Sequence, residues 1–473
     1  MTRYDDVAYP NSPRVQTHPL RLGALAHLFG RPWAPFNGAR ILEVACGDGG
    51  NIINLAQTAP DSEVVGFDLA RSPIEKGRAV IAALELRNIR LEVLDILDAK
   101  DQLGEFDYII AHGLYAWVPA PVRDALWRLC ATSLSARGLA FISYNALPGC
   151  HLRQILRDLL EHQVARTLAP AERLSLATEV LQSYVERWAD GAPLQRALAE
   201  EARLTLARPA EVFFHDELGP VWEPRYLTEV VGEGQAHGLE YLCDAVPGPG
   251  ELLPPDALPI TDDALRLRPL QEQDFVVQRR FRQSIFHRRG QRNPAAEPLR
   301  LPDLFASTDL RPATSPDPGV FRFVRGENEI STTDATFARG LVAIGECHPN
   351  ACPLAALDLG NQGCEALLKL VENQLVTLQT GPFPMAGMPP ARPRASGLAR
   401  WQLSQGLDTL TALHHRAVRI TSPELGTFLQ RLDGTASISE LSRLLEADLG
   451  LQLGPQQVED AVRQACAYGL VEG

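Results

Sequence analysis

The segment ARILEVACGDGGNII (residues 39–53) joins a short apolar run to a cluster of glycines and then to helix-like sequence. This order predicts a buried strand, a tight loop and the first turn of a helix. The glycines matter because only a residue without Cβ lets the backbone lie against a flat ligand and turn sharply into the next helix. Two later apolar runs end in carboxylates, Asp68 and Asp95, and Asp68 stands where an acid accepts hydrogen bonds from ribose hydroxyls. The sequence therefore predicts a nucleotide-binding crossover.

Charge distinguishes between the ligands that such a loop can hold. A pyrophosphate favours glycines and helix N–H groups without a nearby carboxylate, whereas Glu43 and Asp48 flank this loop. S-adenosylmethionine carries a sulfonium and an ammonium group, and carboxylates stabilise both. At this point the chain resembles the class I S-adenosylmethionine-dependent methyltransferases, whose first motif is an acid followed by glycines at alternate positions. Glu43, Gly47 and Gly49 match that motif, and Ala45 replaces its first glycine.

The resemblance implies a set of donor-binding residues. It assigns Glu43 and residues 47–49 to the methionine end of the donor, Asp68 to the ribose, and Asp95 with Ile96 to the adenine. Residues 1–20 are expected either to fold over the donor as a lid, as in many members of the class, or to pack as a surface tail. The predicted S-adenosylmethionine site comprises Tyr9, Glu43, Ala45, Cys46, Gly47, Gly49, Asn51, Asp68, Leu69, Asp95, Ile96 and His112.

Apolar runs alternate with helix-like sequence through the first third of the chain. The predicted strands lie near residues 40–45, 62–67, 89–94, 106–111 and 138–144. Near-continuous apolar strands separated by helices indicate a parallel sheet that is covered on both faces and binds ligands beyond the carboxyl ends of its strands. Residues 1–150 are therefore expected to form an α/β, Rossmann-like core, and the resemblance implies that it belongs to the seven-stranded class I methyltransferase type.

Two further segments are expected to extend this core. Residues 151–222 are strongly helical and are predicted to form an insertion, with His215, Asp216 and Glu217 either in a solvated turn or at the mouth of the site. Residues 223–290 contain another helix and strand, and residues 281–287 suit a last, antiparallel strand. We therefore expect residues 223–290 to return to the same sheet.

Polar and aromatic side chains follow the fourth strand in HGLYAWVP (residues 112–119). Methyl transfer is an in-line displacement, so the protein must bring a lone pair to about 3 Å from the methyl carbon and exclude water. Tyr115 and Trp117 are predicted to shape this channel, because aromatic faces stabilise sulfonium and methylated ammonium groups. His112 is a candidate proton acceptor. The alternative is that His112 only donates a hydrogen bond near the cofactor while both aromatics pack the loop.

The fifth strand runs into YNALPG (residues 144–149), which presents Tyr144 and Asn145 beside that loop. Both side chains can orient an amine or a hydroxyl through an oxygen atom. Together with residues 112–119, this segment resembles the bacterial methyltransferases with a methyltransferase regulatory domain, a group that includes the rickettsial enzymes that methylate lysines of outer-membrane proteins. The resemblance covers roughly residues 4–290. The candidate catalytic residues are His112, Tyr115, Trp117, Tyr144 and Asn145.

The remainder of the chain is predicted to be a separate α+β domain. Residues 291–318 are rich in Arg, Pro, Asp and Ser, which indicates a linker to a domain at residues 319–473. The end of that domain, about residues 420–473, resembles a winged-helix module with three helices and a closing strand. Its acidic surroundings favour a protein partner over DNA, either the substrate or the second subunit of a homodimer. His414 and His415 lie in a polar stretch and need no special role.

Composition sets the outer limits of function. The net charge of −13 on 473 residues argues against nucleic-acid or anionic-membrane binding, which both favour a basic face. The first residues lack the apolar core of a signal peptide, and no apolar run approaches the roughly 18 residues of a membrane span. Eight scattered cysteines fit reduced thiols, and the Cys and His residues at 347–364 match no standard zinc spacing, so no metal is expected. The expectation is a cytoplasmic enzyme.

These features predict an S-adenosylmethionine-dependent methyltransferase whose acceptor is a lysine amine on a protein. A second hypothesis is a small-molecule or natural-product O- or N-methyltransferase, which a narrow, closed pocket over the sulfonium would favour. An open groove lined by acidic residues would favour a protein acceptor instead. A third hypothesis is a non-catalytic protein-interaction module that binds the donor, against which the intact Glu43, Asp68 and Asp95 argue.

Overall fold

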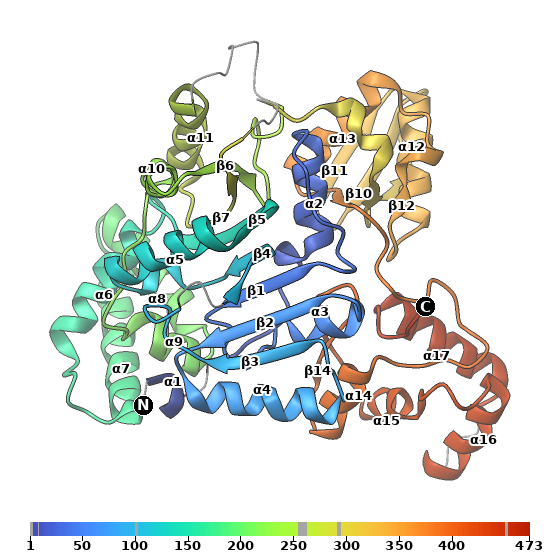
Figure 1. Ribbon diagram of the computed structural model, residues 1–473, viewed down its shortest axis with the longest axis horizontal. Helices are drawn as coiled ribbons and strands as arrows, with labels where there is room; N and C mark the ends of the chain where they lie inside the picture. Colours follow the sequence, from blue (N-terminus) through green and yellow to red (C-terminus); the bar gives the residue numbers. More distant parts are fainter. Residues whose placement is uncertain (1–2, 8, 100–102, 254–262, 291–294, 450–452) are drawn as a thin grey trace.

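The computed structural model describes residues 3–7, 9–99, 103–253, 263–290, 295–449 and 453–473, and its core is a seven-stranded sheet. The strands are β1 (Arg40–Val44), β2 (Glu63–Asp68), β3 (Ile89–Val93), β4 (Phe106–Ala111), β5 (Leu134–Asn145), β6 (Leu239–Asp244) and β7 (Phe281–Arg288). They lie in the order β3-β2-β1-β4-β5-β7-β6 (Figure 1). β1 to β5 run parallel, whereas β7 is antiparallel to both β5 and β6. This arrangement confirms the predicted strands and the expected α/β core, and residues 223–290 supply its last two strands.

Helices cover both faces of the sheet, because successive side chains along each buried strand point to opposite sides. Ile41 and Phe141 pack on one face and Leu42 and Ile142 on the other, in two separate apolar clusters. The first face is covered by α2 (Pro19–Leu28), α3 (Ile53–Thr58) and α4 (Arg71–Ala83). The second is covered by α5 (Ala120–Ser133), α10 (Leu227–Ala236) and α11 (Asp263–Val277).

The predicted helical insertion has an apolar core of its own. Its helices are α6 (His151–Gln163), α7 (Pro170–Trp188), α8 (Pro193–Leu206) and α9 (Ala210–Glu217). Leu156 and Leu160 of α6 pack against Leu181 of α7 and Phe213 of α9. Glu217 is buried and accepts hydrogen bonds from the Arg153 guanidinium at 2.7 and 3.0 Å, so the prediction of a solvated turn is wrong for this residue.

The predicted linker at residues 291–318 is wrong where the structure describes it, because two of its segments are strands of small sheets. β8 (Phe305–Ser307) is the central strand between β12 (Cys352–Pro353) and β13 (Thr377–Gln379). β9 (Arg311–Ala313) joins β10 (Phe321–Arg325) and β11 (Asn328–Thr332). Strands of three residues show no periodicity that could outweigh a Pro- and Arg-rich composition. Two helices, α12 (Ala335–Glu346) and α13 (Gly360–Glu372), complete this part.

The end of the chain carries the three helices that the sequence predicts. It contains α14 (Gly397–Ser404), β14 (Thr409–Thr411), β15 (Ala417–Arg419), α15 (Pro423–Arg431), α16 (Ile438–Leu449) and α17 (Pro455–Ala467). The predicted closing strand is wrong: Val471 and Glu472 form only isolated bridges, to Ala395 and Met385. Among the described helices, none combines the length and the apolarity that crossing a lipid bilayer requires.

The C-terminal domain packs directly on the sheet domain. Leu25 of α2 belongs to the same apolar cluster as Leu341 of α12 and Leu378 of β13, and Figure 1 shows α2 next to the part of the chain that contains α13 and β11. Polar contacts reinforce this packing, since the Thr380 N–H donates to the Leu20 carbonyl at 3.0 Å. The C-terminal domain is therefore placed to form part of any site at this side of the sheet.

Candidate functional site

The glycine loop after β1 takes the sharp turn that its sequence predicts. Gly47 and Gly49 have φ angles of 56° and 76°, in the left-handed region. Ala45 also lies there, at φ 56°, although this conformation costs a residue with a Cβ about 1–2 kcal/mol. Cys46 is buried and its N–H donates to the Phe67 carbonyl of β2 at 3.1 Å. Ala45 thus adopts the left-handed conformation that favours glycine, at the position where the family motif has its first glycine.

Asp68, at the end of β2, is fixed beside this loop. Its Oδ2 accepts the Gly47 N–H at 2.9 Å, and its Oδ1 accepts the Ala70 N–H at 2.8 Å. Burial raises the pKa of the Asp68 carboxyl. The neighbouring Leu69 is 56% exposed, which leaves an apolar side chain free to cover a ligand.

Asp95 and Ile96 follow β3 at the same edge of the sheet. Asp95 accepts the Leu97 N–H at 2.9 Å, and Ile96 is buried in the second apolar cluster. The ends of β1, β2 and β3 are neighbours because the three strands pair in parallel. The structure therefore brings the glycine loop, Asp68 and Asp95 together at one edge, and their contacts with the donor stay predictions.

Glu43 is the buried carboxylate of the loop. Its Oε1 accepts a hydrogen bond from the Asn51 amide at 2.8 Å, whereas its Oε2 is buried without a partner among the described residues. Burial, together with the negative charges of Asp48 and Asp68, raises the pKa of Glu43 to about 8. A positive ligand would lower this pKa and satisfy the free oxygen. The carboxylates therefore favour a cation at the glycine loop.

This raised pKa predicts a pH-dependent affinity for the donor. Because a cationic donor favours ionised Glu43, which is mostly protonated below about pH 8, affinity should rise up to roughly tenfold between about pH 6.5 and about pH 7.5. Isothermal titration with S-adenosylmethionine at several pH values measures this slope. In Glu43→Gln the slope should largely disappear. An equal slope in both proteins would assign it to another group.

The N-terminal segment lies on the glycine loop, and the expectation that it folds over the donor as a lid stays a prediction. The Asn11 amide donates to the Cys46 carbonyl at 2.9 Å and to Asp48 Oδ1 at 3.0 Å. The Arg14 N–H donates to Asn51 Oδ1 at 2.8 Å, and the Arg14 guanidinium acts electrostatically on both Glu43 and His112. Sequence reasoning missed Asn11 and Arg14, because nothing local in residues 9–18 marks them.

Tyr9 points away from the glycine loop. Its hydroxyl reaches Asp216 of α9 at 3.4 Å, and its ring lies 5.6 Å from that of His215. His215 also stacks on Tyr4 at 4.4 Å and bonds to the Val7 carbonyl at 2.8 Å. The start of the chain is thus held against the helical insertion, and a contact of Tyr9 with the donor stays a prediction.

His415 connects the C-terminal domain to the glycine loop, so the interpretation that it needs no special role is wrong. It is fully buried, and burial lowers its pKa to about 3, which keeps the imidazole neutral. Its Nε2 lies 3.0 Å from Asn51 Oδ1 and its Nδ1 lies 3.2 Å from the Asn54 amide. Since Asn51 Oδ1 only accepts, His415 Nε2 donates to it. Asn51 in turn donates to Glu43.

His112 follows β4 at the same edge. Its ring centroid lies 6.2 Å from those of both Phe141 and Phe281, and it is half-buried. Burial and the nearby Arg14 charge lower the His112 pKa to about 4. Asn145, at the end of β5, is buried and its amide has no partner among the described residues. These two side chains remain candidates for contact with a methyl acceptor.

Tyr115 and Tyr144 do not face an open site, which contradicts their prediction as acceptor contacts. The Tyr115 side chain is fully buried, with its hydroxyl bonded to Glu233 and to the Trp127 indole. Tyr144 is also buried and its hydroxyl lies 3.3 Å from Ser284 Oγ. Side chains alternate along β5, so Tyr144 enters the cluster under α5 and α10, on the face opposite its neighbour Asn145.

The burial of Tyr144 predicts that its hydroxyl contributes to the stability of the fold and not to donor binding. Tyr144→Phe should lower the free energy of unfolding by about 1 kcal/mol through the lost hydrogen bond to Ser284 and leave donor affinity unchanged. Urea unfolding and titration with S-adenosylhomocysteine test the two statements. A strong loss of methyl transfer in a folded Tyr144→Phe protein would indicate instead that Tyr144 contacts the methyl acceptor.

Trp117 is half-buried and packs beside Trp222, at the end of the helical insertion. Its ring lies 6.1 Å from that of Trp222, and the guanidinium groups of Arg153 and Arg157 lie 5.5 and 5.7 Å above it. Its contact with an acceptor is therefore not supported. Within the described residues, His, Cys, Asp and Glu side chains form no group that could hold a metal ion.

Two family models match the chain. Residues 41–138 match a family described as "Methyltransferase domain", and residues 209–288 match one described as "Predicted methyltransferase regulatory domain". The first match contains the glycine loop, Asp68, Asp95 and His112. The second contains α10, β6 and β7.

Similar proteins come from Rickettsia. RP789 of Rickettsia prowazekii is 33% identical over 290 residues, which span 60% of this chain and 52% of that protein, so the match covers about half of its length. RP028 of the same organism is 32% identical over 240 residues, which span 50% of this chain and 96% of that protein. Both are described as uncharacterised.

PKMT2 from Rickettsia typhi has a similar structure. It superposes with a TM-score of 0.82 over 98% of this chain and 100% of its own, at 22% identity. Its structure in complex with AdoHcy gives a TM-score of 0.80 at 23% identity. The likeness is one of fold, and it includes the C-terminal domain as well as the sheet.

Proposed function

The chain belongs to the class I S-adenosylmethionine-dependent methyltransferases with a methyltransferase regulatory domain, and from this premise we propose that it methylates the side-chain amine of a lysine in a protein. The observation that carries donor binding is Glu43, whose buried Oε2 lies near Asp48 and Asp68 and has no partner in the part of the chain that the structure describes. A sulfonium and an ammonium group suit these carboxylates, so the residues present fit S-adenosylmethionine. When bound, S-adenosylmethionine supplies an electrophilic methyl group.

The residues at the carboxyl ends of the strands have distinct tasks in this proposal. The glycine loop and Glu43 hold the methionine end, Asp68 the ribose, and Asp95 with Ile96 the adenine. Asn11 and Arg14 cover the loop and exclude water from it, which the displacement requires. These assignments rest on the geometry of the loop and on the family to which the chain belongs.

An amine acceptor is supported by the side chains near His112. His112 is neutral at pH 7, because its pKa is about 4, and can accept a hydrogen bond from the amine. The free Asn145 amide can orient the same group through its oxygen. The exposed Phe281 lies 6.2 Å from His112 between ring centroids, and aromatic faces attract methylated ammonium groups. The resemblance to rickettsial lysine methyltransferases and the fold likeness to PKMT2 favour a protein acceptor.

Isothermal titration with S-adenosylmethionine and then S-adenosylhomocysteine tests the donor site. The protein is then incubated with methyl-labelled S-adenosylmethionine and either lysate protein or small-molecule extract, with Asp68→Ala as the control. Label on protein lysine supports the proposal. Label found only on compounds of the extract would contradict a protein acceptor and indicate a small-molecule O- or N-methyltransferase. Donor binding without any transfer would favour a non-catalytic module, and no donor binding would refute the donor site.

A further inference from the structure

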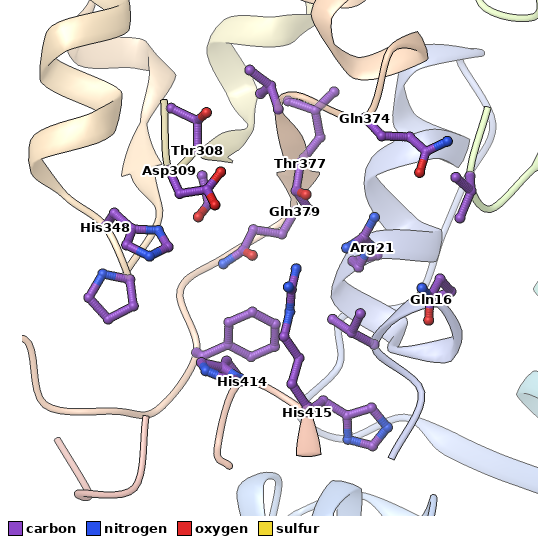
Figure 2. Close-up of a pocket in the computed structure, with 18 of the residues that line it drawn as sticks. Gln16, Arg21, Thr308, Asp309, His348, Gln374, Thr377, Gln379, His414 and His415 are labelled. Atoms are coloured by element: carbon purple, nitrogen blue, oxygen red, sulfur yellow. The ribbon is translucent and has the colours of Figure 1, made fainter. Parts of the chain in front are cut away.

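A large cavity lies between the sheet domain and the C-terminal domain. Its volume is about 760 Å³, and it is lined by the N-terminal segment at residues 12–16, by α2, and by residues 307–309, 374–379 and 414–418. Figure 2 shows Arg21 and Gln16 on one side, Thr308, Asp309 and Gln379 on another, and His414 and His415 below them. None of the predicted donor-binding residues lines this cavity, so donor binding does not explain it.

The cavity is strongly positive, although the chain carries a net charge of −13. Its lining contains four arginines and a single carboxylate, Asp309. Asp309 is already paired with Arg325 at 3.5 Å. The guanidinium groups of Arg21 and Arg416 have no acidic partner among the described residues. The lining therefore holds two unpaired positive charges, those of Arg21 and Arg416.

Arg21 and Arg416 repel each other in this cavity. Burial and the charge of Arg416 lower the pKa of Arg21 to about 10. The same Arg416 charge contributes to the lowered pKa values of His348 and His414, so it acts on three neighbouring cationic or basic groups. His414 Nδ1 is also buried and has no partner within the described segments. Unpaired, desolvated donors cost free energy, and an acceptor with negative charge would remove that cost.

We propose that this cavity binds a small organic anion, whose phosphoryl or carboxylate group lies between Arg21 and Arg416. Guanidinium groups recognise both kinds of oxyanion through paired N–H donors. A single inorganic ion would not fill the cavity, since cavities of about 300–1,000 Å³ are the usual size for drug-sized ligands. The apolar side chains of Leu25 and Phe383 and the Gln16 amide line the rest of the space for the body of that ligand.

The cavity touches the groups that hold the donor loop. Arg416 adjoins His415, which lines the cavity and bonds to Asn51, the partner of Glu43. Arg14 also lines the cavity and bonds to Asn51 through its N–H. A ligand that fills the cavity therefore contacts both segments that bond to Asn51.

Titration of the full chain with inorganic phosphate and with citrate tests this site. Both Arg21→Gln and Arg416→Gln should weaken the tighter probe by about tenfold, the effect of a lost hydrogen bond to a charged group. Arg419→Gln is the matched control, because that side chain is 74% exposed and paired with Asp408. Preference for phosphate would indicate a phosphoryl ligand, and preference for citrate a carboxylate ligand.

Thermal unfolding distinguishes an anion-binding role of Arg21 and Arg416 from a purely structural one. Without added anion, Arg21→Gln and Arg416→Gln should unfold at the same or a higher temperature than the unmodified protein, because each substitution removes like-charge repulsion. Saturable binding that is equal in all four proteins, no saturable binding of either probe, or a lower unfolding temperature in both variants would overturn the proposal. Binding of S-adenosylhomocysteine in the same samples reports the donor site independently.

Discussion

Replacing Gly77 with alanine is expected to destabilise the protein by about 3 kcal/mol and to remove measurable donor binding. Gly77 lies in α4 where that helix crosses the glycine loop. An added Cβ would collide with the Asp48 carbonyl oxygen and the Leu91 side chain, and would lie 2.8 Å from the Asp48 carbonyl carbon. Backbone cannot rotate away as a side chain does, so relief requires α4 or the loop itself to move.

Gly232→Ala is the matched control for this experiment. Gly232 is also a helical glycine, in α10, but an added Cβ there meets nothing within 4 Å. Alanine should therefore stabilise the protein by up to about 1 kcal/mol through helix propensity. Urea unfolding and titration with S-adenosylhomocysteine measure both variants. Equal stability of Gly77→Ala and the unmodified protein would show that α4 does not approach the loop this closely.

Asp68→Ala is expected to weaken binding of S-adenosylmethionine and S-adenosylhomocysteine by between about tenfold and about a hundredfold. This range corresponds to the roughly 1.5–3 kcal/mol of hydrogen bonds to a charged group. The substitution also removes the acceptor for the Gly47 and Ala70 N–H groups, so the loop loses its support from β2.

Asp98→Ala provides the comparison for Asp68→Ala, because Asp98 is exposed on the segment after β3. The affinity of the Asp98→Ala protein for S-adenosylmethionine and S-adenosylhomocysteine should equal that of the unmodified protein. Isothermal titration at one pH measures all three proteins, and thermal unfolding verifies that each is folded. Unchanged affinity in Asp68→Ala would mean that the ribose is held elsewhere.

The stretch at residues 39–53 and the apolar runs after it determined the sheet. The strands β1 to β5, the antiparallel β7 and the positions of Asp68 and Asp95 all follow from local patterns, since a buried strand and a turn are recorded in neighbouring residues. The same patterns placed the glycine loop at the carboxyl end of β1. The donor class followed from the charges that flank that loop.

Only the tertiary structure decided how the rest of the site is assembled. His415 reaches Asn51 across 364 positions of sequence, and the Asn11 and Arg14 contacts with the loop are equally invisible to local periodicity. The cavity that Arg21 and Arg416 line is formed by residues from both ends of the chain. Alternation along β5 predicts that Tyr144 and Asn145 face opposite ways, but the packing of α5 and α10 decides that Tyr144 is the one that enters the apolar cluster. Local sequence specifies dihedral angles and faces, whereas burial and long-range hydrogen bonds exist only once distant segments meet.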